Sequence, residues 1–241
     1  MIETTALDGA TLVRMNRPPV NALDIELNDA IAATFGVLEG PIVLTGTGRC
    51  FSAGVDLRAI LDGGPDYAGP FLDSLIACFL AIFDYPAPVV AAVNGHALAG
   101  GCVIAMAADI RYMSGGTIGI TEIAVGVPFP SSAIEICRHV MGSSATAAAL
   151  SGEAVRADEA MRRGWVDATT TPDELLDTAT ARARALGSLA PEAYAFTKQQ
   201  LHRRARAAID AGAEEDAHVA RSWRSDETRV RIAEFLANLA R

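Results

Sequence analysis

The stretch that decides the fold is VNGHALAGGCVIAMAAD, residues 93–109. It begins with a turn at Asn94–Gly95, continues to a glycine pair at Gly100–Gly101, and carries no charged side chain before Asp109. The apolar segment that leads into it, residues 86–93, is typical of a strand buried on both faces of a parallel sheet. The first amides of a helix have no partner within the helix, and the helix dipole attracts negative charge there. The sequence therefore predicts a strand and turn that enter a helix, with glycines that let a bound group approach its first amides.

A second glycine turn, FSAGVDL at residues 51–57, also lies between an apolar strand and the start of a helix. Asp56 is in position to cap that helix. One backbone N–H from each turn could converge on a single carbonyl oxygen and form an oxyanion hole, in which the loss of one donor typically costs about 10²–10³ in rate. Such a site needs no side chain from the glycine helix, which explains why that helix carries so few polar groups.

The rest of the chain predicts an α/β body followed by helices. IETTAL, an Asp8–Gly9 turn and ATLVRMNRP predict an N-terminal β-hairpin. PIVLTG (residues 41–46) predicts another short strand, residues 70–83 predict a helix, and strand and helix alternate to about Val166. From Thr171 onward the patterns are helical with polar faces. We therefore expect residues 1–170 to form the α/β core and residues 171–241 to form a helical region.

The composition is that of an ordinary globular protein, with 51% hydrophobic and 20% charged residues among 241. The net charge of −9 argues against nucleic-acid binding. The longest uninterrupted apolar runs are shorter than the about 20 residues that span a bilayer. The first residues show no basic region followed by an apolar stretch. We therefore expect a cytoplasmic protein without a membrane partner.

Three other kinds of site have little support in the sequence. The four cysteines are far apart and form no CxxC, which indicates free thiols and no metal site. CFSAG is not the GxSxG of a nucleophilic hydrolase, and His96 and His139 lack the spacing that marks a triad. GTGRCF lacks the third glycine of a dinucleotide-binding fingerprint, and no GxxxxGK[ST] phosphate loop is present.

Several motifs, taken together and in order, resemble the crotonase family, also called the enoyl-CoA hydratase/isomerase superfamily. They are NRPPVNAL, CFSAGVDL, PVVAAVNGHALAGGCVIAMAADIRY, IGITEIAVGVPFP, SGEAVRADEAMRRGWVD and SDETRVRIAEFL. The resemblance covers nearly the whole chain. It implies a spiral of ββα units (1–170) followed by a C-terminal helical region (171–241) that builds homotrimers, often paired into hexamers. It also implies a coenzyme A thioester as the substrate, with no cofactor besides the CoA that the substrate carries.

The resemblance also assigns roles to residues of the two turns. The backbone N–H groups of Val55 and Gly100 would form the oxyanion hole and stabilise a thioester enolate. Arg58 would contact a CoA phosphate, with Arg17 and Lys198 as further candidates, although a solvated surface charge is the alternative for each of the three. The residues expected to bind substrate or CoA are Ser52, Ala53, Asp56, Leu57, Arg58, Gly101 and Lys198.

The sequence departs from the pattern of the family's hydratases, which carry two glutamates. The first of these positions is occupied by Val103 and the second by Glu122. Hydration of a conjugated double bond requires groups that deprotonate water and protonate C2, and valine can do neither. Moving a double bond from the 3,4 to the 2,3 position requires one base, which an apolar wall would make more basic. Glu122 is therefore the predicted catalytic residue, and an isomerase is favoured over a hydratase.

Alternatives to a single-base isomerase remain open at the level of the sequence. Glu135 or Asp73 could replace the missing acid in a hydratase, although each is also a plausible surface residue. Thioester hydrolysis, decarboxylation, or a non-catalytic CoA-binding or assembly role would fit the same fold. The apolar residues that repeat at helical spacing could line an acyl pocket or belong to the core; they are Phe71, Leu72, Leu75, Ile76 and Phe79.

Overall fold

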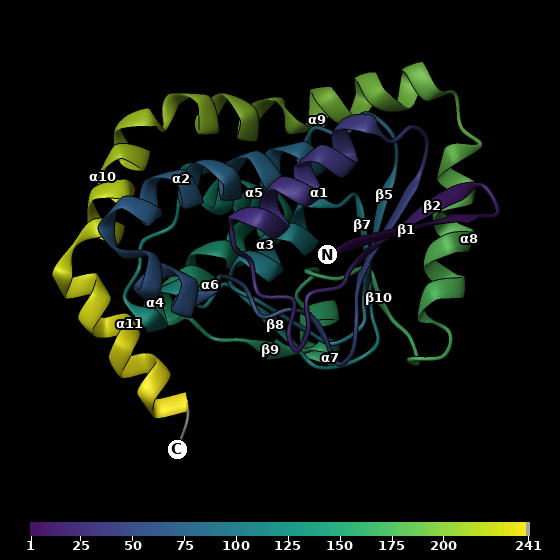
Figure 1. The fold of residues 1–241 in the computed structure, drawn as a ribbon. Coiled ribbons are helices and arrows are strands. Elements are labelled where there is room, and N and C mark those ends of the chain that lie inside the picture. The colour runs from purple at the N-terminus through teal and green to yellow at the C-terminus, as the bar shows by residue number, and fades with distance from the viewer. Residues whose placement is uncertain (240–241) are drawn as a thin grey trace.

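The computed structural model describes residues 1–239 and shows an α/β protein with helices on both sides of its larger sheet (Figure 1). The strands are β1 (Ile2–Leu7), β2 (Ala10–Met15), β3 (Ile42–Gly46), β4 (Cys50–Ser52), β5 (Val89–Val93), β6 (His96–Leu98), β7 (Ile110–Met113), β8 (Thr117–Gly119), β9 (Val155–Arg156) and β10 (Ala168–Thr169). The helices are α1 (Ile25–Val37), α2 (Leu57–Phe83), α3 (Gly100–Ala107), α4 (Glu122–Val125), α5 (Ser131–Met141), α6 (Ala145–Ser151), α7 (Ala157–Arg162), α8 (Leu175–Gly187), α9 (Pro191–Ala211), α10 (Ala213–Arg224) and α11 (Asp226–Leu239), with a 3₁₀ turn at Gly142–Ser144.

The strands alternate between two sheets and thereby form repeated ββα units. The larger sheet has the order β1-β2-β3-β5-β7-β10, and the smaller has the order β4-β6-β8-β9. The pairs β3/β4, β5/β6 and β7/β8 each place their first strand in the larger sheet and their second in the smaller one, and a helix follows each pair. The predicted spiral of ββα units is confirmed by this topology.

The N-terminal hairpin and the buried parallel strands are also confirmed. Strands β1 and β2 pair antiparallel from Ile2↔Met15 to Leu7↔Ala10, and Gly9 in the turn has a φ of 77°. Every residue of β3 and β5 is buried, and successive side chains of each strand belong to two different apolar clusters. The larger sheet is therefore covered on both faces, as the continuous apolar runs predict.

Helix α2 is longer than predicted and is broken near its start. The expected helix over residues 70–83 is its second part, and Gly64 interrupts the helical geometry with φ 71° and ψ −170°. Pro65 follows the break and has no N–H to continue the ladder. Among residues 1–239, α2 is the one helix long and apolar enough to span a bilayer by length and composition, and 56% of its most apolar window is buried within the protein.

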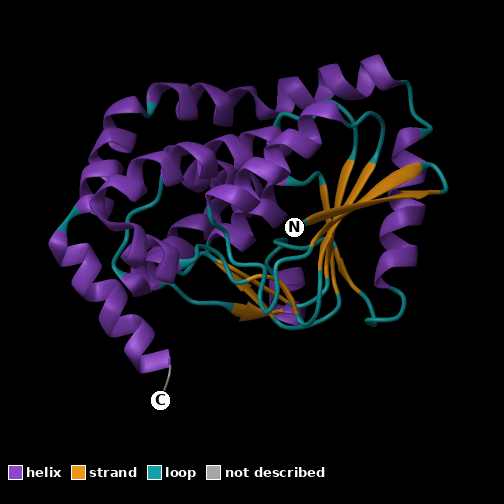
Figure 2. Ribbon diagram, in the orientation of Figure 1, coloured by secondary structure: helices purple, strands orange, loops and turns teal. Residues whose placement is uncertain are grey.

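The helices after Thr171 pack in two different places. Helix α8 lies on the outer face of the larger sheet, where Leu175, Ala179 and Ala183 contact the apolar side chains of that face (Figure 2). Helices α9 and α10 pack against α5, and α10 and α11 pack along α2. The division into residues 1–170 and 171–241 stays a prediction, since α8 belongs to the packing of the sheet.

Candidate active site

The two glycine turns predicted to form an oxyanion hole lie in direct contact. Gly54 has a φ of 82°, and a Cβ at this position would lie 2.6 Å from the Leu98 carbonyl oxygen and 3.2 Å from the Gly100 nitrogen. Only glycine combines this left-handed conformation with so close an approach of two backbones. The absence of a side chain at Gly54 therefore allows the backbone of this turn to lie against the start of α3.

The local hydrogen bonds orient the Val55 amide. Leu23 donates its N–H to the Gly54 carbonyl over 2.8 Å, and Asp56 donates its N–H to the Leu23 carbonyl over 2.8 Å. These two bonds form an isolated parallel bridge between Leu23 and Val55 and leave the Val55 N–H directed away from it. Within residues 1–239 the Val55 amide has no hydrogen-bond acceptor.

The amino end of α3 supplies the second amide. Ala99 precedes the helix with φ 50° and ψ −126°, an unusual conformation for a residue with a side chain, and no side chain caps the helix. Its carbonyl accepts the N–H groups of Cys102 and Val103 at 2.8 and 3.1 Å, whereas the Gly100 N–H finds no acceptor in the described chain. Strained backbone of this kind tends to occur at functional sites. Two unused amides therefore lie on neighbouring turns, and their role as an oxyanion hole stays a prediction.

Ser52, Ala53 and Gly101 have roles in shaping these turns. The Ser52 hydroxyl donates to the Asn21 carbonyl over 2.8 Å and accepts the Gly54 N–H over 3.2 Å, and its side chain is fully buried. Ala53 donates its N–H to the Val20 carbonyl over 2.9 Å. A Cβ at Gly101 would overlap the Ser52 carbonyl. The polar groups of these residues are thus directed at the protein backbone.

The start of α2 is more accessible than the turns. The Asp56 carboxylate accepts the N–H groups of Arg58 and Ala59 at 3.1 and 3.0 Å, which confirms the predicted helix cap. Leu57 is half-buried, whereas Arg58 is exposed and has no ion-pair partner within residues 1–239. Arg17, in contrast, pairs with Asp24. Of these two arginines, Arg58 is the one that is free to bind an anion.

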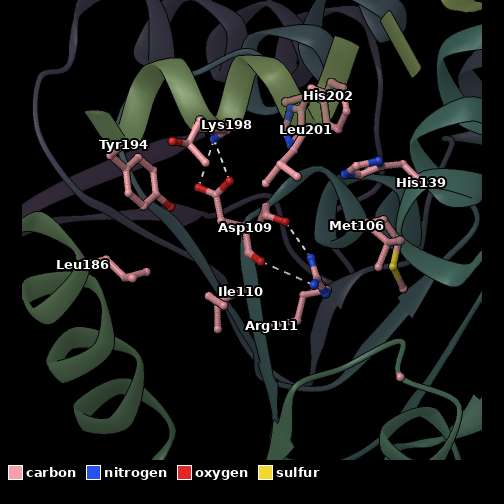
Figure 3. A pocket seen from close by; sticks show the side chains of 15 residues that line it. Met106, Asp109, Ile110, Arg111, His139, Leu186, Tyr194, Lys198, Leu201 and His202 are labelled. Carbon is pink, nitrogen blue, oxygen red and sulfur yellow. Dashed lines mark hydrogen bonds and ion pairs between the residues drawn. The ribbon is translucent and has the colours of Figure 1, made fainter. Parts of the chain in front are cut away.

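Lys198 lies elsewhere, in a cavity of about 400 Å³ at the other end of α3 (Figure 3). Its ammonium group is 2.9 Å from both carboxylate oxygens of Asp109, which also accepts the Val89 N–H over 2.8 Å. Burial lowers the pKa of Lys198, and Asp109 opposes that shift. Asp109 follows the carboxyl end of α3, about 12 Å along the helix from Gly100. The structure therefore does not bring Lys198 together with the two turns.

Glu122 begins α4 and is buried in an apolar environment. Only 7% of the residue is exposed, and its Oε2 atom is buried without a hydrogen-bond partner. Burial raises the pKa of Glu122 from 4.5 to about 8, while backbone N–H groups of residues 121 and 122 oppose the shift weakly. No charged group contributes to this shift. A carboxyl group in such surroundings can both take and return a proton near neutral pH.

The position of the other hydratase glutamate, occupied here by Val103, is apolar. Val103 is fully buried in α3, next to Cys102, which interacts with Cys137 of α5. The pKa of Cys137 is raised by its hydrogen bond with Cys102, by burial, and by the charges of Cys102 and Glu122. Glu122 therefore lies within electrostatic reach of Cys137, which contacts α3 through Cys102. The four cysteines are free thiols, and residues 1–239 contain no cluster of three or more potential metal ligands.

The two acids that could replace the missing glutamate are engaged at other places. Glu135 pairs with Arg138, one turn further along α5. Asp73 is exposed and lines a cavity of about 250 Å³ between α2 and α10. Of the candidate acyl-pocket residues of α2, Phe71, Leu72, Leu75 and Phe79 belong to the apolar core, whereas Ile76 is half-buried and lines the same cavity as Asp73. Leu75 and Phe79 lie against the side of Gly100.

The sequence of the whole chain identifies the protein family to which it belongs. A sequence model of the enoyl-CoA hydratase/isomerase family matches residues 6–236. The chain belongs to the enoyl-CoA hydratase/isomerase family. Members of this family act on acyl-CoA substrates, so the small-molecule substrate expected from the sequence is supported at that level.

Individual relatives carry the names of both reactions. The chain is 35% identical over 164 residues to a putative enoyl-CoA hydratase of Thermus thermophilus, a match that covers 66% of this chain and 65% of that protein. It is 32% identical over 210 residues to the short-chain-enoyl-CoA hydratase of Clostridium acetobutylicum, covering 83% and 80%. The human mitochondrial delta3-delta2-enoyl-CoA isomerase superposes with a TM-score of 0.93 over 99% of this chain and 98% of that chain, at 21% identity. This last similarity establishes the crotonase fold.

Sequence reasoning did not find the contacts between the C-terminal helices and the segment that follows Glu122. Trp223, Asp216 and Arg231 of the C-terminal helices contact the segment that follows Glu122. Trp223 was the available signal for such a contact, because a buried tryptophan tends to donate its N–H to a hydrogen-bond acceptor. The pattern of a polar helix did not show what that partner would be.

Proposed function

We propose that this protein is a 3,2-enoyl-CoA isomerase that uses Glu122 as its single base. The observation that carries the proposal is a buried glutamate with a pKa near 8 in a chain that has Val103 in place of a second acid. A group with this pKa exists in both protonation states near neutral pH, as a base that must also return its proton requires.

The proposed reaction consists of two proton transfers. Glu122 takes a proton from C2 of a 3-enoyl thioester, and the negative charge spreads onto the thioester oxygen. The amides of Val55 and Gly100 donate hydrogen bonds to that oxygen and stabilise the dienolate. The protonated glutamate then returns the proton to C4. The double bond moves from the 3,4 to the 2,3 position without a net change in atoms.

The remaining proposals concern CoA binding and the assembly of subunits. We propose that Arg58, exposed at the start of α2, contacts a phosphate of CoA, and that Asp56 and Leu57 line the same entrance. We also propose a cytoplasmic homotrimer or dimer of trimers that needs no cofactor besides the CoA of its substrate. Support for assembly comes from Phe196 and Leu201, whose side chains project from α9 with 60% and 66% of their surface exposed.

A hydratase is the second candidate, because the relatives from Thermus thermophilus and Clostridium acetobutylicum carry that name. In a hydratase, a bound water or another acid would have to do the work of the residue replaced by Val103. Glu135 is the acid to test, since it lies on α5 beside the elements that surround Glu122.

The test uses a short 3-enoyl-CoA and the matching 2-enoyl-CoA in parallel, followed by the absorbance of the conjugated thioester. An isomerase produces that absorbance from the 3-enoyl substrate and does not consume it from the 2-enoyl substrate. Glu122→Gln is expected to abolish the signal, and Glu135→Gln, which also removes one carboxylate, is expected to leave it unchanged. Loss of the 2-enoyl absorbance would establish hydration. No change with either substrate would favour thioester hydrolysis, decarboxylation or a binding role.

A further inference from the structure

Trp223 of α10 connects two parts of the candidate active site that are far apart in the sequence. Only 2% of its surface is exposed. Its Nε1–H donates to the Pro128 carbonyl over 3.1 Å, and its ring lies 5.8 Å from the ring of Phe71 in α2. One side chain therefore contacts both the loop after Glu122 and the helix that follows the Val55 turn.

The segment that carries Glu122 has little structure of its own. Helix α4 has four residues and ends at Gly126, which adopts the left-handed conformation with φ 83°. The Val127 N–H donates to the Glu122 carbonyl over 3.2 Å, so the loop that contains Pro128 is attached to the backbone of the base. Because a single helical turn is marginal by itself, contacts from outside determine where Glu122 lies.

Those outside contacts come from α6 and from the C-terminal helices, which run past α2 and α4 at one side of the molecule (Figure 1). The Asp216 carboxylate of α10 accepts the N–H and the hydroxyl of Ser131 at 2.7 and 2.6 Å, just after the loop. Arg231 of α11 packs on Gly126, where a Cβ would lie 2.6 Å from its side chain. Trp223 lies between Asp216 and Arg231 in the sequence and also contacts Phe71 of α2.

We propose that Trp223 is a positioning residue for Glu122, which holds the base-bearing segment against α2 through the Pro128 carbonyl and the Phe71 ring. The proposal rests on the proposed role of Glu122 as the base. It gives the C-terminal helices a role within their own subunit, in addition to the assembly proposed above.

The consequence of losing the indole N–H is specific. The Pro128 carbonyl would lose its partner, and the loop would move to hydrate it. Water would then reach the Glu122 carboxyl, whose raised pKa results from burial alone. The other titratable groups around the segment are the Cys102 and Cys137 thiols, Asp216, which accepts the two Ser131 hydrogen bonds, and Arg231, which is paired with Glu227. None of them depends on Trp223 for a hydrogen bond.

The experiment compares Trp223→Phe with Trp165→Phe. Both tryptophans are almost fully buried, and Trp165 donates its Nε1–H to the Ser144 hydroxyl over 2.7 Å and not to the loop after Glu122. The titration of Glu122 is followed directly by the infrared band of its protonated carboxyl group, identified as the band that Glu122→Gln removes. We expect a midpoint near pH 8 in the unchanged protein and in Trp165→Phe, and a midpoint lower by about one pH unit in Trp223→Phe.

Activity provides a second readout. We expect kcat for the 3-enoyl-CoA to fall by about tenfold in Trp223→Phe, with KM nearly unchanged, because a displaced base slows proton transfer more than it weakens binding. A folded Trp223→Phe with the midpoint of the unchanged protein would overturn the proposal. If this variant does not fold, 3-benzothienylalanine at position 223 in the Trp165→Phe background keeps the ring and removes only the N–H, and the same criterion applies. A shifted midpoint in a protein without isomerase activity would refute the proposed function and retain the positioning role.

Discussion

Replacing Gly54 with alanine is expected to separate the two turns of the candidate oxyanion hole. Two effects add in this variant. Alanine at a φ of 82° costs about 1–2 kcal/mol, because the left-handed region is unfavourable for a residue with Cβ. The added Cβ would lie 2.6 Å from the Leu98 carbonyl oxygen and 2.7 Å from the Ala99 Cβ. Crowding of a packed site costs typically about 1–3 kcal/mol more.

The displacement can be estimated from the same distances. An ordinary contact of 3.4 Å in place of 2.6 Å requires the backbones to move apart by about 0.8 Å. A misplacement of about 1 Å at a reacting centre can cost about 10²-fold in rate. We therefore expect kcat/KM for a 3-enoyl-CoA to fall by about 10²-fold in Gly54→Ala, with a loss of stability of about 2–5 kcal/mol in urea unfolding.

Gly48→Ala is the matched control. Gly48 has a φ of 69°, and a Cβ there would meet nothing within 4 Å. This variant should show the loss of about 1–2 kcal/mol that comes from the backbone and keep its kcat/KM. If Gly54→Ala is folded and turns over within about threefold of the unchanged protein, close approach of the two turns is not needed for the reaction.

Three further predictions concern charged groups. The pKa of Glu122 is about 8 in the folded state and 4.5 when the group is exposed. The buried carboxyl group therefore carries no ionisation penalty below pH 4.5, and from there up to about pH 8 the penalty increasingly destabilises the fold. Glu122→Gln should therefore gain stability relative to the unchanged protein over this range, on the order of 5 kcal/mol at pH 9 in urea unfolding, and an equal difference at pH 4 and pH 9 would contradict the assignment. Lys198→Ala leaves Asp109 buried without its partner and should lose about 3–5 kcal/mol of stability. The KM for acyl-CoA should stay constant in this variant. A raised KM in the folded variant would indicate that Lys198 does contact CoA. Arg58→Ala should raise that KM by about threefold to tenfold at low salt and less at high salt, with kcat unchanged, and a salt-independent KM would argue against a phosphate contact.

The sequence predicted those parts of the fold that depend on neighbouring residues. The Asp8–Gly9 hairpin, the buried strands β3 and β5, and the cap at Asp56 each follow from a local pattern, and each is present. The resemblance of ordered motifs added the spiral and the contact between the two glycine turns. Gly54 and Gly100 meet because their turns follow β4 and β6, which are neighbouring strands of the smaller sheet. A single motif does not show that these strands are neighbours.

Residues whose partners are far along the chain were harder to predict. Lys198 has the appearance of a solvated charge in a polar helix, yet its partner Asp109 is 89 positions away. Trp223 reaches Pro128 across 95 positions. Helix α2 consists of two helical parts that meet at the non-helical Gly64; the sequence predicted the start after Asp56 and residues 70–83, and missed that the second part begins right after the break.

The ion pair of Lys198 also gives this protein a simple chemical reporter. Lys198 is the sole lysine of the sequence, so it carries the only side-chain amine. Only 7% of the residue is exposed, and its ammonium group is held between α9 and the end of α3. An amine-reactive reagent can modify this side chain only when α9 moves away from the end of α3. The rate of modification at Lys198, read separately from that of the exposed N-terminal amine, therefore measures how often this part of the protein opens, without an engineered label.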